Sequence, residues 1–329
     1  MLQWQDKPIF IGGHRKSGTT LIPCLFDGND EVVSLPYDTG FFYGFYPVCN
    51  NTDLSDEAKI DLAIKYLCKN DLIDQLKIAG KYEKTKIELD LLQQSFYDNF
   101  SSSSKTPREA LLCFVNSFKK IFYDNSKSPK IWLQKTTSSE IYAKEIFEWF
   151  PNTKFIHIIR DPRDNFASLK SGWEKLYSLR TNDSNELIQS MIDRGKLCME
   201  LAILNSQRFG KQKYMVVKFE DIVTDPKKYI KKICDFIEIQ YEENLLNPTV
   251  FGHHWKGNNL EDKNFKGISS SNINKWENRI LKSEAYLIEY YFRNLMEHFN
   301  YQIKFDINNH IDAAVEHYNW YNKNQSFKV

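Results

Sequence analysis

The sequence has no run of about 18 apolar residues, so we expect no membrane-spanning helix. A strand-like segment begins only seven residues from the first methionine, which leaves no room for the basic and apolar regions of a signal peptide. A charge surplus is missing too, because 44 Lys and Arg residues against 43 Asp and Glu residues give a net charge of +1. Nucleic-acid coating needs a basic surplus, so we exclude that class and expect no nucleic-acid partner.

The sequence also lacks cysteine or histidine pairs with the spacing of metal ligands. The six cysteines are scattered without a C-x-x-C pair, and His253 and His254 are adjacent, so their side chains should diverge. We therefore predict buried or free thiols in a reducing compartment and no zinc site. Together with the missing signal and membrane anchor, this predicts a cytoplasmic protein, and it argues against a Golgi-type enzyme that acts on secreted protein or glycan.

The chain does have enough apolar and aromatic residues to bury a core, 42% and 15% respectively. Short apolar segments alternate with longer helical patterns, which predicts an α/β fold with a mostly parallel sheet between helices. The expected strands are residues 8–13, 31–35, 130–135, 154–160 and 214–219. The expected helices are residues 19–28, 55–80, 84–99, 107–123, 138–150, 163–177, 184–209, 226–238, 281–299 and 310–321.

We interpret residues 1–329 as one domain. Residues 43–128 interrupt the alternation as a helical insertion, and residues 300–329 form a C-terminal extension without a motif. Segments inserted near strand ends often carry specificity, so we expect the insertion to help form the site for the second substrate. The aromatic side chains near its start either stack on that substrate or belong to the core. These side chains are Phe41, Phe42, Tyr43, Phe45 and Tyr46.

A phosphate-binding loop follows the first strand. Gly13 to Thr20 fit the pattern G-x-x-x-x-G-x-T at the start of a helix, where backbone N–H groups and the helix dipole favour anions. A nucleotide P-loop would have a lysine at the position of Thr19. Here the cations are Arg15 and Lys16, inside the loop. The alternative is a glycine-rich turn with incidental charges.

A second candidate anion site lies where the strand 154–160 ends. Arg160 is at its carboxyl end, and Ser168 follows eight residues later in the next helix. Ligands of open α/β sheets bind beyond the carboxyl ends of the strands. An arginine there offers a phosphate two donors and a serine hydroxyl a third. The alternative is a helix capped by Asp161 with surface arginines.

The two motifs resemble those of sulfotransferases that use 3′-phosphoadenosine 5′-phosphosulfate (PAPS), most of all the bacterial and tyrosylprotein types. RKSGTTL is similar to the 5′-phosphosulfate loop, and R-D-P-R-D-x-x-x-S is similar to the 3′-phosphate site. Further similar segments are FDGNDEVVSLPYDTGFF (26–42), WLQKTTSS (132–139), VKFEDIVTDPKKYIKKICDFI (217–237) and ISSSNINKW (268–276). The resemblance implies a P-loop-like three-layer fold and transfer of a sulfuryl group from PAPS without a metal.

The resemblance also implies roles for individual residues. Lys16 and Lys135 would be the cations at the reaction centre, although Lys135 is also compatible with a strand-edge lysine. The 5′-phosphate would be held by the loop, and the 3′-phosphate by Arg160 and Ser168. The implied loop contacts come from Arg15, Lys16, Ser17, Gly18, Thr19 and Thr20.

Other residues of the implied site differ from the family pattern or have a plain alternative. Phe219 replaces a common tyrosine near the adenine and could equally be a core residue. Lys266, Gly267 and Lys275 resemble a segment that closes over the nucleotide, or they form a solvated charged stretch. Thr137 stands where the family has proline after K-T.

A hydroxyl acceptor needs a general base. The resemblance places it at Asp38, where the family commonly has the longer glutamate. Asp38 as a turn residue and His14 as the base are the alternatives.

Three functions remain open at this point. A sulfotransferase is favoured, with a small-molecule, glycan or lipid-linked acceptor that carries a hydroxyl or amine. A P-loop nucleotide kinase or NTPase is disfavoured by Thr19. An inactive nucleotide-binding protein is the third. The oligomeric state is not readable from the sequence.

Overall fold

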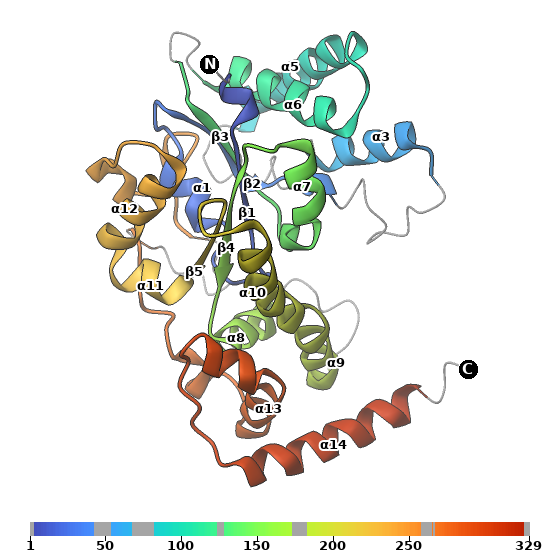
Figure 1. The fold of residues 1–329 in the computed structure, drawn as a ribbon, viewed down its shortest axis with the longest axis vertical. Coiled ribbons are helices and arrows are strands. Elements are labelled where there is room, and N and C mark those ends of the chain that lie inside the picture. The colour runs from blue at the N-terminus through green and yellow to red at the C-terminus, as the bar shows by residue number, and fades with distance from the viewer. Residues whose placement is uncertain are drawn as a thin grey trace.

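A five-stranded parallel sheet forms the centre of the computed structural model, which describes residues 3–42, 54–67, 82–123, 128–172, 183–257, 265 and 267–325 (Figure 1). The strands are β1 (Pro8–Gly12), β2 (Val32–Asp38), β3 (Ile131–Lys135), β4 (Lys154–Ile159) and β5 (Tyr214–Lys218). Their order across the sheet is β2-β3-β1-β4-β5. All five strands were expected from the sequence, and parallel pairing brings their carboxyl ends to one edge.

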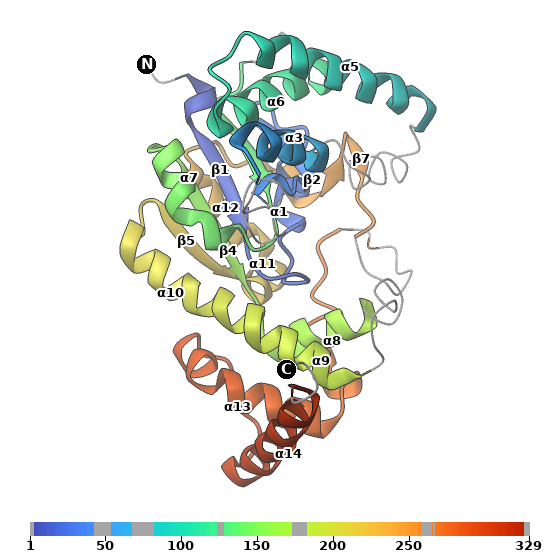
Figure 2. The same cartoon turned by 90° about the vertical axis from the view of Figure 1, so that its right-hand side faces the viewer.

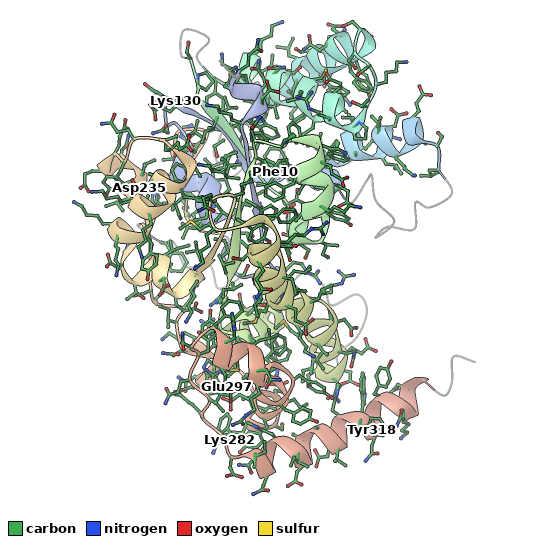
Figure 3. The ribbon with its side chains drawn as sticks, in the orientation of Figure 1. Phe10, Lys130, Asp235, Lys282, Glu297 and Tyr318 are labelled. Atoms are coloured by element: carbon green, nitrogen blue, oxygen red, sulfur yellow. The ribbon has the colours of Figure 1, made fainter. Side chains whose placement is uncertain are left out.

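The alternating side chains of the strands separate two cores on the two faces of the sheet. In β1, Ile9 and Ile11 belong to one buried cluster, and Phe10 belongs to the other. Because successive strand residues point to opposite faces, each strand contributes to both cores. Figure 3 shows Phe10 near the centre of the molecule, surrounded by side chains from the helices.

Helices cover both faces, which confirms the predicted P-loop-like three-layer arrangement (Figures 1 and 2). One face is covered by α1 (Leu21–Phe26), α11 (Phe219–Thr224) and α12 (Pro226–Ile237). The other is covered by α3 (Asp56–Leu67), α5 (Tyr82–Ser101), α6 (Pro107–Phe122), α7 (Ala143–Trp149) and α10 (Leu197–Phe209). Local sequence explains two helix starts: Thr106 and Asp225 each cap a helix whose first residue is proline.

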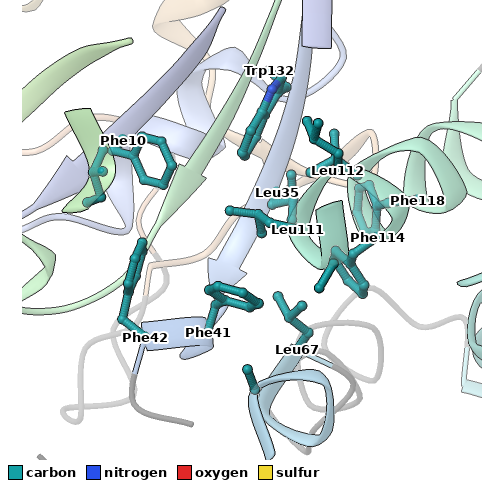
Figure 4. Packing of buried hydrophobic residues seen from close by; sticks show 14 of the residues in the cluster. Phe10, Leu35, Phe41, Phe42, Leu67, Leu111, Leu112, Phe114, Phe118 and Trp132 are labelled. Atoms are coloured by element: carbon teal, nitrogen blue, oxygen red, sulfur yellow. The ribbon is translucent and has the colours of Figure 1, made fainter. Parts of the chain in front are cut away.

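The core between β2, β3 and α6 is rich in aromatic rings (Figure 4). Phe41 and Phe42 are fully buried there, and the Phe42 ring stacks on Trp149 at a centroid distance of 5.8 Å. These two rings are therefore core residues and do not stack on a substrate. The other members of the aromatic stretch, Tyr43, Phe45 and Tyr46, lie outside the described residues.

A third buried cluster surrounds Ile159 at the carboxyl end of β4, and helices that follow β4 in the chain form it. The helices here are α8 (Pro162–Gly172), α9 (Ser184–Ser190), the π-helical turn η5 (Met191–Lys196), α13 (Lys282–His298) and α14 (Ile307–Gln325). Helix α14 packs on α13 and extends away from the sheet (Figure 1). The sequence predicted this last helix as 310–321, and it is longer at both ends.

The remaining elements are short. They are η1 (Trp4–Asp6), η3 (Ser139–Tyr142), η6 (Glu243–Leu246), η7 (Lys275–Asn278) and a small hairpin of β6 (Thr249–Val250) and β7 (His253–His254). His253 and His254 form strand β7, and both are exposed. Cys24, Cys113, Cys198 and Cys234 are buried free thiols, as expected. No helix in the described segments is long and apolar enough to cross a bilayer.

Candidate active site

The loop between β1 and α1 curls sharply because three of its residues have positive φ angles. These angles are +141° at Gly13, +63° at Lys16 and +94° at Gly18. Gly18 also has no room for a side chain, because a Cβ there would lie 2.3 Å from ring carbon Cδ2 of Phe219. A lysine in the left-handed region is uncommon, and such strained residues cluster at functional sites. Its backbone angle thus singles out Lys16 within the loop.

The carbonyl oxygens of the loop are bound to donors of the protein. Arg160 Nη1 donates to the Lys16 carbonyl at 2.8 Å, and Asn165 Nδ2 donates to the Arg15 carbonyl at 2.7 Å. With these carbonyls fixed, the loop presents N–H groups on its other side. Among the described residues the amides of Gly18 and Thr19 have no protein acceptor. The loop is therefore built to receive an anion.

The loop forms one wall of a cavity of about 330 Å³ at the carboxyl ends of the strands. Most of the residues predicted from the sequence line it. They are Arg15, Lys16, Gly18, Thr19, Thr20, Asp38, Lys135, Arg160, Ser168, Phe219 and Gly267. Residues from four separate motifs thus meet in one place, as the parallel sheet requires.

Positive charge dominates this cavity. Burial lowers the pKa of Lys16, and the nearby charges of Lys135 and Arg160 lower it further. Asp38 is the single acidic side chain among the described lining residues. A set of mutually repelling cations around one carboxylate favours the binding of a polyanion, which relieves the repulsion.

Asp38 and Lys135 form an ion pair at the ends of two neighbouring strands. Lys135 Nζ lies 2.7 Å from Asp38 Oδ2. The pairing of β2 with β3 is irregular between Ser34 and Asp38, and this shift brings Asp38 opposite Lys135. Pro36 lies within the irregular stretch, where it cannot donate a hydrogen bond to a neighbouring strand. The structure therefore places Asp38 and Lys135, two of the three predicted catalytic residues, side by side.

Arg160 connects the loop to the segment that precedes α13. Its Nη2 donates to the Asn272 carbonyl at 2.9 Å, and its guanidinium lies over the Phe219 ring at 4.7 Å. The buried Nε has no partner among the described residues. Ser168 lines the same cavity from α8. The predicted 3′-phosphate residues are thus adjacent to the loop, with one guanidinium donor unused.

The second half of the R-D-P-R-D motif has a structural role. Arg163 is buried and pairs with Asp161 at 2.6 Å and with Glu289 of α13 at 2.5 Å. Asp164 accepts hydrogen bonds from the backbone N–H groups of Asn274 at 2.6 Å and Trp276 at 2.9 Å. One motif therefore supplies a cavity residue, Arg160, and also fixes the segment opposite it.

Two residues that were predicted to bind the donor do not line the cavity, and a third lies outside the described residues. Ser17 does not line the cavity, because its N–H and hydroxyl both donate to the His14 carbonyl, at 3.1 and 2.6 Å. Lys275 is exposed and outside the cavity, because the turn anchored on Asp164 directs it to solvent. Lys266 lies outside the described residues.

His14 also lies outside the cavity, which argues against it as the general base. Its side chain is buried behind the loop, and its Nδ1 is 2.7 Å from Asn165 Oδ1. Burial lowers its pKa to about 4.

A cluster of buried polar side chains supports the loop from behind. Gly13 N donates to Glu140 Oε2 at 2.8 Å, and His14 N donates to Cys198 Sγ at 3.1 Å. His157 Nε2 is in turn 3.1 Å from Cys198 Sγ. Ligand atoms of Glu140, His157 and Cys198 lie within 4.8 Å of one another, a spacing that a metal ion also requires. Here these groups bind one another and the loop amides.

Several lining residues were missed by the sequence analysis. Trp255 and Phe265 line the cavity, and neither was singled out from the sequence. An isolated tryptophan in a Gly- and Asn-rich stretch was the available signal. Thr137 was noted only as a departure from a motif, and yet it lines the cavity beside Asp38.

The same motifs place the chain among known proteins. The sequence profile described as "Sulfotransferase family" matches residues 8–243. Protein-tyrosine sulfotransferase A of Caenorhabditis elegans is 22% identical over 276 residues, which are 83% of this chain and 58% of that relative.

Solved structures agree on the fold. The sulfotransferase domain from the curacin biosynthetic pathway superposes with a TM-score of 0.60 at 15% identity, over 90% of this chain and 98% of that domain. The sulfotransferase domain of the Synechococcus PCC 7002 olefin synthase gives 0.57 at 18% identity, over 92% and 100%. At these identities the superpositions carry the fold alone.

Proposed function

The chain belongs to the sulfotransferase family, and we propose that it transfers a sulfuryl group from PAPS to a hydroxyl or amine acceptor and releases adenosine 3′,5′-bisphosphate. The observation that carries this proposal is the cavity between two anion sites. The loop with Lys16 forms one, and Arg160 with Ser168 forms the other. A donor with phosphates at its 5′ and 3′ positions fits two such sites.

The position of the loop cation argues against a nucleotide kinase. Thr19 occupies the place of the lysine that reaches the β- and γ-phosphates in P-loop enzymes. Lys16 instead sits at the bend of the loop, and Lys135 approaches from β3. Both cations line the cavity, and in the proposed reaction they stabilise the negative charge that develops when the sulfur–oxygen bond breaks. Their placement suits catalysis by electrostatic stabilisation.

The other cavity residues suit donor binding. The N–H groups of Gly18 and Thr19 are available to the 5′-phosphate. Arg160 and Ser168 line the cavity and would bind the 3′-phosphate, and the buried Nε of Arg160, unpartnered among the described residues, would reach it as the site adjusts to the donor. The Phe219 ring touches Gly18 and lies against Arg160, where it can pack on the adenine. These residues bind and orient the donor.

Asp38 is the proposed general base. It is the carboxylate of the cavity, and it lies beside Lys135. The C. elegans relative is named for tyrosine sulfation. We therefore add a phenolic hydroxyl, on a small molecule or a protein, to the glycan and lipid-linked acceptors predicted from the sequence. A cytoplasmic location and an acceptor role for residues 43–128 stay predictions.

A ligand-binding experiment tests the donor site. Adenosine 3′,5′-bisphosphate at 100 times its dissociation constant should stabilise the fold by about 2.7 kcal/mol, read as a rise in melting temperature. Arg160→Ala should abolish this rise, whereas Arg208→Ala, which removes an exposed arginine outside the cavity, should keep it. Stabilisation by ATP with Mg²⁺ but not by the bisphosphate would favour a nucleotide kinase over a sulfotransferase.

Turnover tests the reaction itself. The chain should transfer labelled sulfate from PAPS to at least one member of a panel of phenols, sugars and alkyl glycosides. Bisphosphate binding without any transfer would favour the inactive nucleotide-binding protein.

A further inference from the structure

The turn that follows β3 holds the Asp38 carboxylate in an unsymmetrical way. Lys135 Nζ, Thr137 Oγ1 and Thr137 N all donate to Asp38 Oδ2, at 2.7, 2.6 and 3.4 Å. The other oxygen, Oδ1, has no hydrogen-bond partner among the described residues and is shielded from solvent. One oxygen therefore has its lone pairs engaged, and the other keeps both available.

Thr137 supplies two of these three donors. Its hydroxyl makes the shortest contact, and its amide adds the longest. A proline at this position would lack both donors, because it has neither a hydroxyl nor a backbone N–H. The residue at 137 thus decides how firmly Asp38 is held.

The same turn is also fixed to the phosphate loop. Ser138 N donates to the Gly13 carbonyl at 3.1 Å, and Ser139 Oγ donates to the Ile11 carbonyl at 3.2 Å. Ser138 has a φ of +61°, which turns the chain at this point. The Asp38 carboxylate and the phosphate loop are therefore both anchored to the short segment 137–139. A rigid segment of this kind can set the distance between a base and a bound donor.

We propose, on the basis of the function proposed above, that Thr137 is a positioning residue that engages Asp38 Oδ2 so that Oδ1 receives the proton of the acceptor hydroxyl. In this step the acceptor O–H bond breaks and its proton moves to Oδ1. The acceptor oxygen forms the new bond to sulfur. The bond from sulfur to the 5′-phosphate oxygen breaks, and its electron pair stays on that oxygen. Because Oδ1 is shielded, the acceptor reaches it only as the pocket adjusts on binding.

Two variants of Thr137 and two acceptors test this proposal. Thr137→Val removes the hydroxyl and keeps the shape, and Thr137→Ser keeps the hydroxyl. 4-Methylphenol and 4-nitrophenol are similar in size, but at mildly alkaline pH only 4-nitrophenol is largely ionised and needs no base. Thr137→Val should lower kcat for 4-methylphenol by about 10- to 100-fold, the effect of losing a hydrogen bond to a charged group. For 4-nitrophenol the loss should be small, and Thr137→Ser should retain activity with both.

The controls separate positioning from general damage. Thr137→Val should lower the melting temperature by only a few degrees, because it removes one hydrogen bond, and both variants should bind the bisphosphate as the unchanged chain does. In an Asp38→Asn background, Thr137→Val should cause no further loss, because the carboxylate it positions is gone.

Several outcomes would overturn the proposal. Equal losses with both phenols, a change confined to the KM of PAPS, or additive effects with Asp38→Asn would show that Thr137 acts elsewhere. An unchanged chain that binds the bisphosphate but sulfates neither phenol would also count against it. A chain that neither binds the bisphosphate nor transfers sulfate would instead refute the proposed function and the role of Thr137 with it.

Discussion

Gly18→Ala tests whether the loop and the Phe219 ring form one donor site. The new methyl group would lie 2.3 Å from Phe219 Cδ2 and 2.7 Å from Cε2, so the ring must move. That ring also lies under the guanidinium of Arg160. One added carbon therefore disturbs the loop, the ring and the arginine together. We expect bisphosphate affinity to fall at least tenfold, which corresponds to about 1.4 kcal/mol.

Gly28→Ala provides the matched control. Gly28 also has a positive φ, +80°, but a Cβ there would meet no atom within 4 Å. Gly28→Ala should lose about 1–2 kcal/mol of unfolding free energy through backbone strain, and Gly18→Ala should lose more, because its methyl group also displaces the Phe219 ring. Only Gly18→Ala should also lose affinity.

Urea denaturation and calorimetric titration with adenosine 3′,5′-bisphosphate measure the two quantities. The reasoning is refuted if Gly18→Ala binds the bisphosphate as tightly as Gly28→Ala does. A lower affinity of Gly18→Ala, measured at a temperature where both variants are folded, would support it.

Two further predictions concern buried charges. Burial lowers the pKa of His14 to about 4 and that of His157 to about 3, below the 6.5 of an unfolded histidine. The unfolded state therefore binds more protons than the folded state below pH 6.5. The unfolding free energy should fall between pH 7 and pH 5 by on the order of 2 kcal/mol per histidine, and urea denaturation midpoints measure this change. A His14→Asn variant whose pH dependence stays as steep would contradict this. Arg163→Met should lower the unfolding free energy by about 3–5 kcal/mol, because it leaves the buried Glu289 without its arginine partner. Arg160→Met should mainly lose bisphosphate binding. Similar stability losses in the two variants would disprove this difference between the two arginines.

The sequence predicted the sheet and the meeting of the motifs because both follow from local patterns. Short apolar strands pair in parallel when helices connect them, and their carboxyl ends then share one edge. The convergence of Lys16, Asp38, Lys135 and Arg160 follows from that rule. It did not require knowledge of any side-chain contact.

What the sequence could not show is which partner each candidate side chain binds. Arg160 and Arg163 are three residues apart and chemically alike, yet Arg163 finds Glu289, 126 positions away. Ser17 lies within the loop motif, but its amide and hydroxyl turn back to the His14 carbonyl. Spacing along the chain identifies candidate residues. Which way each one turns depends on neighbours that only folding supplies.

The fixed carbonyls of the phosphate loop have a kinetic consequence. Because Arg160 and Asn165 hold the peptide groups of Lys16 and Arg15, the loop loses its freedom during folding and not when a ligand arrives. An incoming polyanion then meets a preformed rim of N–H groups and need not wait for the loop to rearrange. Its association rate should therefore be governed by long-range attraction to the cations, and it should slow as the ionic strength rises.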